Sequence, residues 1–97
     1  MYARVITVQW KVDQVEEAIT FFRENVVPAL RQQPGFANAR LLVDHNTGKG
    51  MMMSVWQSEA DLQASSNSGF LKTQVGHLSR FFATAPLIDH YEICVNG

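Results

Sequence analysis

The chain is poor in the residues that build disulfides and metal centres. Its 97 residues include one cysteine, Cys94, and three histidines, His45, His77 and His90. A single cysteine cannot close an internal disulfide, and the spacing of these four residues matches no zinc or iron motif. We therefore expect no internal disulfide and no metal held by protein ligands.

Charge of one sign and long apolar runs are also scarce. Eight Lys and Arg face nine Asp and Glu, a formal net charge of −1, and the basic residues form no run. Nucleic acids and anionic membrane surfaces select clustered basic side chains, and a bilayer span needs roughly 20 apolar residues. We predict neither nucleic acid nor membrane as a partner. Because the first residues lack the layout of a signal peptide, we expect a cytoplasmic protein.

The length is that of one small domain, without a linker, a repeat or a low-complexity segment. We therefore predict a single domain over residues 1–97. Small domains bury a smaller share of their surface on folding than large ones do, so a second copy of the chain would add useful buried area.

The first third of the chain predicts a strand followed by a helix. Residues 2–12 are rich in β-branched and aromatic side chains, which favour a strand. Asp13 and Glu16 have the spacing of a capping box, and an apolar stripe at helical spacing follows them. Pro28 removes one helical hydrogen bond and should loosen the last turn, and Pro34-Gly35 ends the helix.

The rest of the chain predicts three strands and a broken helix. Residues 36–43 alternate between apolar and other side chains, as a strand does, and residues 44–50 are turn formers. The remaining predicted elements are a strand over 51–57, a helix over 59–65 capped by Ser58, a break over 65–69, a helical continuation to about residue 84 and a strand over 88–95.

The element order β-α-β-β-α-β predicts an α+β protein with the ferredoxin-like fold, a four-stranded antiparallel sheet with both helices on one face. Both faces of the predicted strands are apolar: the first strand has Val5 on one face and Ile6 on the other, and the third has Met53 on one face and Met52 on the other. Two helices cover only one face. We therefore predict a homodimer through the other sheet face, and leave open which face meets the helices.

Four short segments carry a family resemblance: Gln33-Pro34-Gly35-Phe36, Thr47-Gly48, Trp56-Gln57-Ser58-Glu59-Ala60 and Tyr91-Glu92. With their order and spacing, the chain resembles the dimeric α+β barrel superfamily, and most of all its antibiotic biosynthesis monooxygenase (ABM) domains. The resemblance implies a dimeric α+β barrel whose pocket oxidises electron-rich aromatic or quinol-type substrates with molecular oxygen, without a metal, a flavin or another cofactor. A phenolate or enolate can itself reduce oxygen, so the protein supplies deprotonation, a dry pocket and orientation.

The resemblance and the pattern of the second helix together predict site residues. Trp56 matches a family tryptophan whose indole N–H can bind a substrate carbonyl or a reduced oxygen species, although a tryptophan at a strand end can equally be core packing. His77 shares a helical stripe with Phe70 and Phe81 and can take a phenolic proton, or it can be a boundary histidine bonded to water. The predicted pocket residues are therefore Trp56, His77, Met52, Phe70 and Phe81, with Trp56 and His77 as the catalytic candidates.

Two other functions stay open. Met52 and Leu62 stand where some family members have an asparagine and a tyrosine, which favours a non-catalytic dimeric module that binds a small apolar or aromatic molecule. A haem-binding or haem-degrading protein is the third possibility. It is disfavoured because the first strand lacks the asparagine of that branch, Ser65 stands near its tryptophan, and His77 is a few residues from its histidine.

Overall fold

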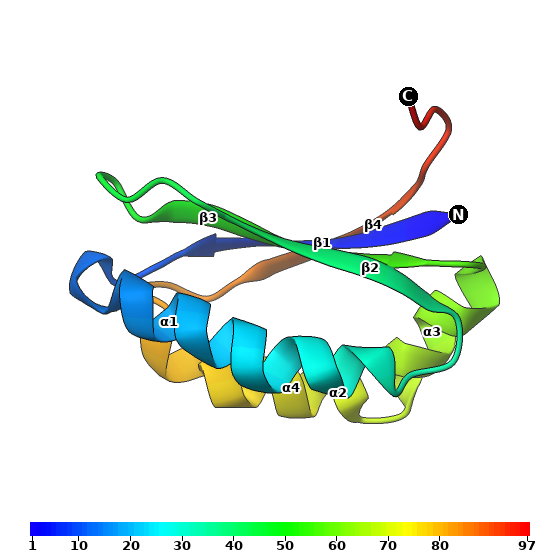
Figure 1. The fold of residues 1–97 in the computed structure, drawn as a ribbon, viewed down its shortest axis with the longest axis horizontal. Coiled ribbons are helices and arrows are strands. Elements are labelled where there is room, and N and C mark those ends of the chain that lie inside the picture. The colour runs from blue at the N-terminus through cyan, green and yellow to red at the C-terminus, as the bar shows by residue number, and fades with distance from the viewer.

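The computed structural model describes all 97 residues as one layer of helices on one face of a four-stranded antiparallel sheet (Figure 1). The strands are β1 (Tyr2–Gln9), β2 (Phe36–Val43), β3 (Lys49–Trp56) and β4 (Leu87–Glu92). The helical elements are η1 (Val12–Gln14), α1 (Val15–Phe21), η2 (Phe22–Val26), α2 (Val27–Arg31), α3 (Glu59–Asn67), α4 (Phe70–Leu78) and η3 (Ser79–Phe81). The strand order β2-β3-β1-β4 is that of the predicted ferredoxin-like fold, which is confirmed.

The first helix contains a π-helical turn at the place where Pro28 was expected to loosen it. Pro28 lies in the first turn of α2 and has no N–H to donate to the carbonyl of the preceding turn. The π-helical turn η2 comes directly before it, and the Val27 N–H there bonds to the carbonyl of Phe22, five residues back. The chain thus stays helical through the proline by widening one turn.

The predicted capping box at the start of this helix is wrong. The chain enters through the 3-10 turn η1, which places Lys11 at the N-cap and Asp13 inside the turn, and no side chain caps η1 or α1. The Glu16 carboxylate instead lies 3.2 Å from Nε2 of His45 in the β2-β3 hairpin. The other predicted cap is confirmed, since the Asp61 N–H donates to Ser58 Oγ at 3.1 Å.

Several predicted boundaries also differ. The strand over 2–12 ends at Gln9, and Trp10 forms an isolated bridge with Phe82. Of the residues predicted to break the second helix, Ser65 and Ser66 remain helical, and the break is limited to Ser68 and Gly69, whose φ is +85°. The last helical turn stops at Phe81 and β4 at Glu92.

The strand register shows which face of the sheet meets the helices. Side chains alternate along each strand, and the even-numbered residues of β1 and β3, such as Ile6 and Met52, are buried under the helices. The opposite face carries Val5 and Met51, together with the exposed side chains Leu42, Leu87 and Tyr91, of which 46%, 67% and 56% are accessible. This open apolar face is the one that the dimer prediction requires.

None of the helices has the length and apolar character needed to cross a membrane.

Two glycines provide a matched test of this packing. A Cβ on Gly50 would overlap the buried Trp10 indole and lie 2.7 Å from the Leu42 carbonyl oxygen, whereas one on Gly76 in α4 would meet no atom within 4 Å. We expect Gly50→Ala to lower the free energy of unfolding by about 1–3 kcal/mol through overpacking, and Gly76→Ala to raise it by up to about 1 kcal/mol. Urea unfolding measures both. Equal stability of the two variants would contradict the predicted tight contact.

Candidate functional site

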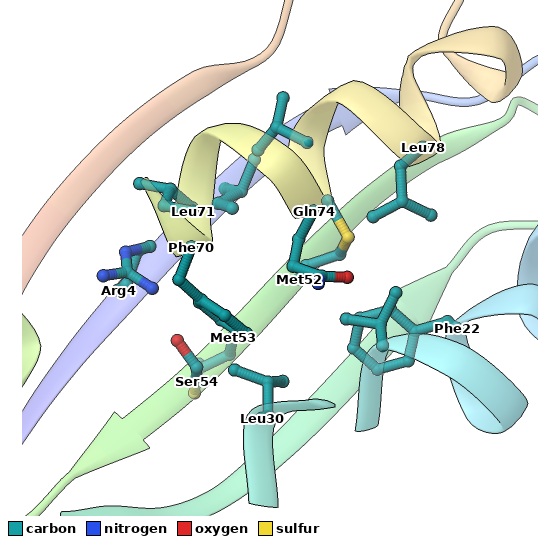
Figure 2. Close-up of a pocket in the computed structure, with 13 residues that line it drawn as sticks. Arg4, Phe22, Leu30, Met52, Met53, Ser54, Phe70, Leu71, Gln74 and Leu78 are labelled. Carbon is teal, nitrogen blue, oxygen red and sulfur yellow. The ribbon is translucent and has the colours of Figure 1, made fainter. Parts of the chain in front are cut away.

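A cavity of about 40 Å³ lies between the sheet and the helices (Figure 2). Its walls come from strands β1 and β3, the first helical run and α4, and ten of its thirteen lining residues are hydrophobic. The lining residues are Arg4, Ile6, Phe22, Val26, Leu30, Met52, Met53, Ser54, Phe70, Leu71, Gln74, Val75 and Leu78. The cavity is therefore an apolar space with three polar side chains, those of Arg4, Ser54 and Gln74.

The α4 wall is the less completely buried side of the cavity. A volume of 40 Å³ holds a few water molecules, whereas pockets for drug-sized ligands measure about 300–1,000 Å³. The lining residues Phe70, Leu71, Gln74 and Val75 of α4 are half-buried, whereas Met52 on the sheet is almost completely buried. An aromatic ligand would therefore enter by displacing side chains of α4, with the sheet as the rigid floor.

Arg4 is the unusual residue of this site, because it is a cation that is only 2% exposed. Its Nη2 donates to the Leu62 carbonyl oxygen at 3.1 Å and to the hydroxyls of Ser65 and Ser66 at 2.5 and 2.7 Å. Its Nε is buried without a hydrogen-bond partner. Burial lowers the pKa of Arg4 to about 10, so the side chain remains charged at neutral pH.

Arg4 was not predicted from the sequence as a site residue. One signal was available in the sequence. Side chains two residues apart in a strand point to the same face, so the charged Arg4 shares a face with the apolar side chains of Ile6 and Val8. Long basic side chains at such positions usually reach solvent, and the strand pattern alone does not show that α3 closes over this one.

Trp56 is fully buried and is joined to the polar part of the cavity. Its Nε1 donates to Ser54 Oγ at 3.0 Å, and the Arg4 guanidinium carbon lies 5.5 Å from its ring centroid. The ring packs edge-on against Phe36, with 5.7 Å between centroids. Trp56 does not line the cavity. It supports the two polar residues of the sheet that do, Ser54 and Arg4.

The other predicted pocket residues lie in two places. Met52 and Phe70 line the cavity from the sheet and from α4. His77 is exposed, with its ring edge-on to Phe21 at 6.3 Å between centroids, and Phe81 is buried against the same phenylalanine at 6.0 Å. The structure thus brings Met52 and Phe70 together and leaves His77 and Phe81 outside this cavity.

A row of polar residues crosses the sheet at the level of Arg4. Ser54 on β3 and His90 on β4 are its register partners on either side. Burial, and next the Arg4 cation, lower the pKa of His90, while the neighbouring Asp89 raises it. His90 is exposed, as are all the residues of β4, so Ser54 and Arg4 are the members of this row that reach the cavity. No three His, Cys, Asp or Glu side chains gather closely enough to share a metal ion.

The Trp56–Ser54 hydrogen bond provides a test of how tightly this site is held. Ser54→Ala leaves the buried indole N–H without an acceptor, and we expect the free energy of unfolding to fall by about 1–3 kcal/mol. Ser79→Ala, which removes an exposed hydroxyl bonded to the Gly76 carbonyl, should change it by less than about 0.5 kcal/mol. Chemical denaturation of both variants measures the difference, and an unchanged Ser54→Ala stability would rule out the predicted cost.

The solved structures with similar folds include two with named ligands. A monooxygenase from the gene ActVA-Orf6 of Streptomyces coelicolor, in complex with nanaomycin D, has a TM-score of 0.80 at 14% identity, covering 98% of this chain and 88% of that one. The haem degrader MhuD of Mycobacterium tuberculosis, with two haems in its active site, has a TM-score of 0.79 at 18% identity, covering 100% and 99%. At these identities the similarity shows a shared fold.

Among curated sequences, the uncharacterized protein Rv2557 of Mycobacterium tuberculosis is 28% identical over 97 residues. The match covers 96% of this chain and 41% of that protein, so the chain spans less than half the length of this relative. The family model for the antibiotic biosynthesis monooxygenase domain matches residues 1–82, from β1 to the end of the helical layer. The chain therefore belongs to the antibiotic biosynthesis monooxygenase family.

Proposed function

We propose that this protein is a cofactor-independent monooxygenase that oxidises small electron-rich aromatic or quinol-type substrates with molecular oxygen. The observation that carries the proposal is the cavity between sheet and helices, which is apolar except for Arg4, Ser54 and Gln74. Membership of the ABM family and the fold shared with a monooxygenase that was solved with nanaomycin D support it.

In the proposed reaction the substrate supplies the electrons. A phenolate reduces oxygen, one oxygen atom replaces a ring hydrogen to give a quinone, and the other leaves as water, so no further reductant is needed. The protein's part is to exclude water, orient the ring and favour the anionic substrate. The Arg4 cation favours that anion, because a nearby positive charge lowers the pKa of a phenol.

The second candidate is a non-catalytic module that binds a small apolar or aromatic molecule. One observation favours it: no histidine or carboxylate lines the cavity, so no side chain there has the usual chemistry of a general base. His77 stays a predicted catalytic residue, although the structure places it outside the cavity, and mutation decides its role.

We propose further that residues 1–97 form one domain and that two copies associate through the open sheet face. The strand β4 completes the sheet beyond residue 82, where the family match ends, which supports a domain that includes the last strand. The exposed apolar side chains on the face opposite to the helices support the dimer.

A cytoplasmic location is also proposed, and the exposed free thiol of Cys94 is compatible with a reducing compartment.

Oxygen consumption with a panel of hydroxyanthracenes and quinols tests the enzyme. We expect uptake above the uncatalysed rate, and a loss of at least about tenfold in Val75→Phe, because the larger side chain fills the small cavity. Lys72→Gln, an exposed change on the same helix, should leave the rate unchanged. Trp56→Phe should lower the rate, because it removes the indole N–H that donates to Ser54 in the cavity wall, and His77→Gln tests whether His77 takes part.

Binding of these aromatic compounds without any oxygen uptake would contradict the proposed monooxygenase activity and support the non-catalytic binding module. A Soret shift on adding haemin, in place of either result, would favour the haem protein. Uptake that persists in a folded Val75→Phe variant would place the reaction outside this cavity.

Analytical ultracentrifugation tests the dimer. We expect the protein to sediment as a dimer at micromolar concentration and Val5→Glu to shift it to the monomer, because a buried, unpaired charge at the centre of the sheet face is costly. Thr20→Glu, on the exposed side of α1, should leave the dimer intact. A monomeric wild-type protein would overturn the proposed assembly.

A further inference from the structure

Arg4 has no counterion within the chain. The one ion pair of the structure joins His45 and Glu16, both well exposed, and the hydrogen-bond partners of Arg4 are two hydroxyls and a carbonyl. Neutral acceptors replace only part of the hydration that a guanidinium loses on burial, and an unpaired buried charge destabilises the folded protein. The Arg4 charge therefore weakens the folded state unless something negative binds beside it.

The hydrogen bonds of Arg4 leave part of the guanidinium free. All three go from Nη2 toward α3, and they account for a role in holding that helix on the sheet. The Nε is buried without a partner, and Nη1 donates to no protein atom. A guanidinium presents five N–H donors in a planar fork that matches the oxygens of a carboxylate, so donors remain for a ligand.

Ser54 provides a second donor at the same place. It is the register partner of Arg4 on β3, and both side chains line the cavity, as Figure 2 shows. The Ser54 hydroxyl accepts from the Trp56 indole and donates to no protein atom. Its proton is therefore available to an acceptor in the cavity, and the indole N–H behind it strengthens that donation.

We propose that Arg4 and Ser54 form an anion-binding site at the floor of the cavity, which receives the anionic oxygen, carboxylate or phenolate, of an aromatic ligand. The apolar lining, with Met52 and Phe70, takes the ring. The inference rests on the proposed function in that it places the aromatic ligand in this cavity, and it narrows the substrate class to acidic aromatics. Arg4 thereby determines specificity, in addition to holding α3.

Calorimetric titration with matched ligands tests this site. We expect the wild-type protein to bind 2-naphthoate about ten- to a hundredfold more tightly than the neutral 2-naphthamide, since a hydrogen bond to a charged group contributes more than a neutral one. Arg4→Met should remove the preference, and Arg4→Lys should restore part of it. A titration with 4-nitrophenol on either side of its own pKa shows whether phenolate as well as carboxylate is accepted, and selection of either anion supports the site.

Two further variants separate recognition from structure. Ser65→Ala removes a hydroxyl that accepts a hydrogen bond from Arg4 but leaves the Arg4 charge in place. The preference for 2-naphthoate should therefore persist even if the protein is less stable. Val75→Phe should weaken both naphthalene ligands equally, because it fills the cavity without touching the charge. If Arg4→Met does not fold, loss of the preference in Ser54→Ala tests the same site.

The anion site would be overturned if the wild-type protein bound 2-naphthoate no more tightly than 2-naphthamide and 4-nitrophenolate no more tightly than neutral 4-nitrophenol. A preference for the anion that survives in folded Arg4→Met would also overturn it, as would no binding of either anion at millimolar concentration. These results are independent of oxygen uptake. If the protein selects 2-naphthoate but consumes no oxygen with any substrate, the proposed anion site stands and the proposed monooxygenase activity is contradicted.

Discussion

The rest of this structure depends on one constraint: the helices can cover only one of the two faces of the sheet. The helical layer covers the side of β1 and β3 that carries Ile6 and Met52, and the alternation of side chains then sends every second residue of those strands to the other side. The same alternation places Arg4 and Ser54 under the helices, where they become part of the cavity wall. The candidate site and the open apolar face are therefore two results of one packing arrangement.

Within the covered face, the polar residues form one connected group. Trp56 donates to Ser54, the Arg4 guanidinium lies near the Trp56 ring, and Arg4 holds α3 through Ser65. Buried polar groups are tolerated when they are bonded to one another, but in this group the Arg4 Nε is buried without a partner, and Arg4 Nη1 and the Ser54 hydroxyl donate to no protein atom. Arg4 and Ser54 both line the cavity, where a ligand would supply acceptors that the chain does not.

The site was only partly predictable from the residues. Trp56 was singled out because it lies in a recognisable strand-end segment, Met52 because it stands where some family members have a polar pocket residue, and Phe70 because it shares a helical stripe with His77. His77 shares its helical stripe with Phe70, but the side of α4 on which it lies faces solvent beside Phe21, which depends on how the helices pack. Arg4 escaped notice because its sequence neighbours do not reveal the helix that closes over it.

The sequence by itself determined the order and type of the elements, because hydrophobic period, Pro28, the Ser58 cap and the turn residues act over a few neighbouring positions. It also carried the family resemblance. Only the tertiary structure decided which sheet face the helices cover, that Asp13 and Glu16 form no capping box, and that Ser65 stays helical while bonded to Arg4. These outcomes depend on contacts between segments as many as 61 residues apart, and local pattern contains no information about such contacts.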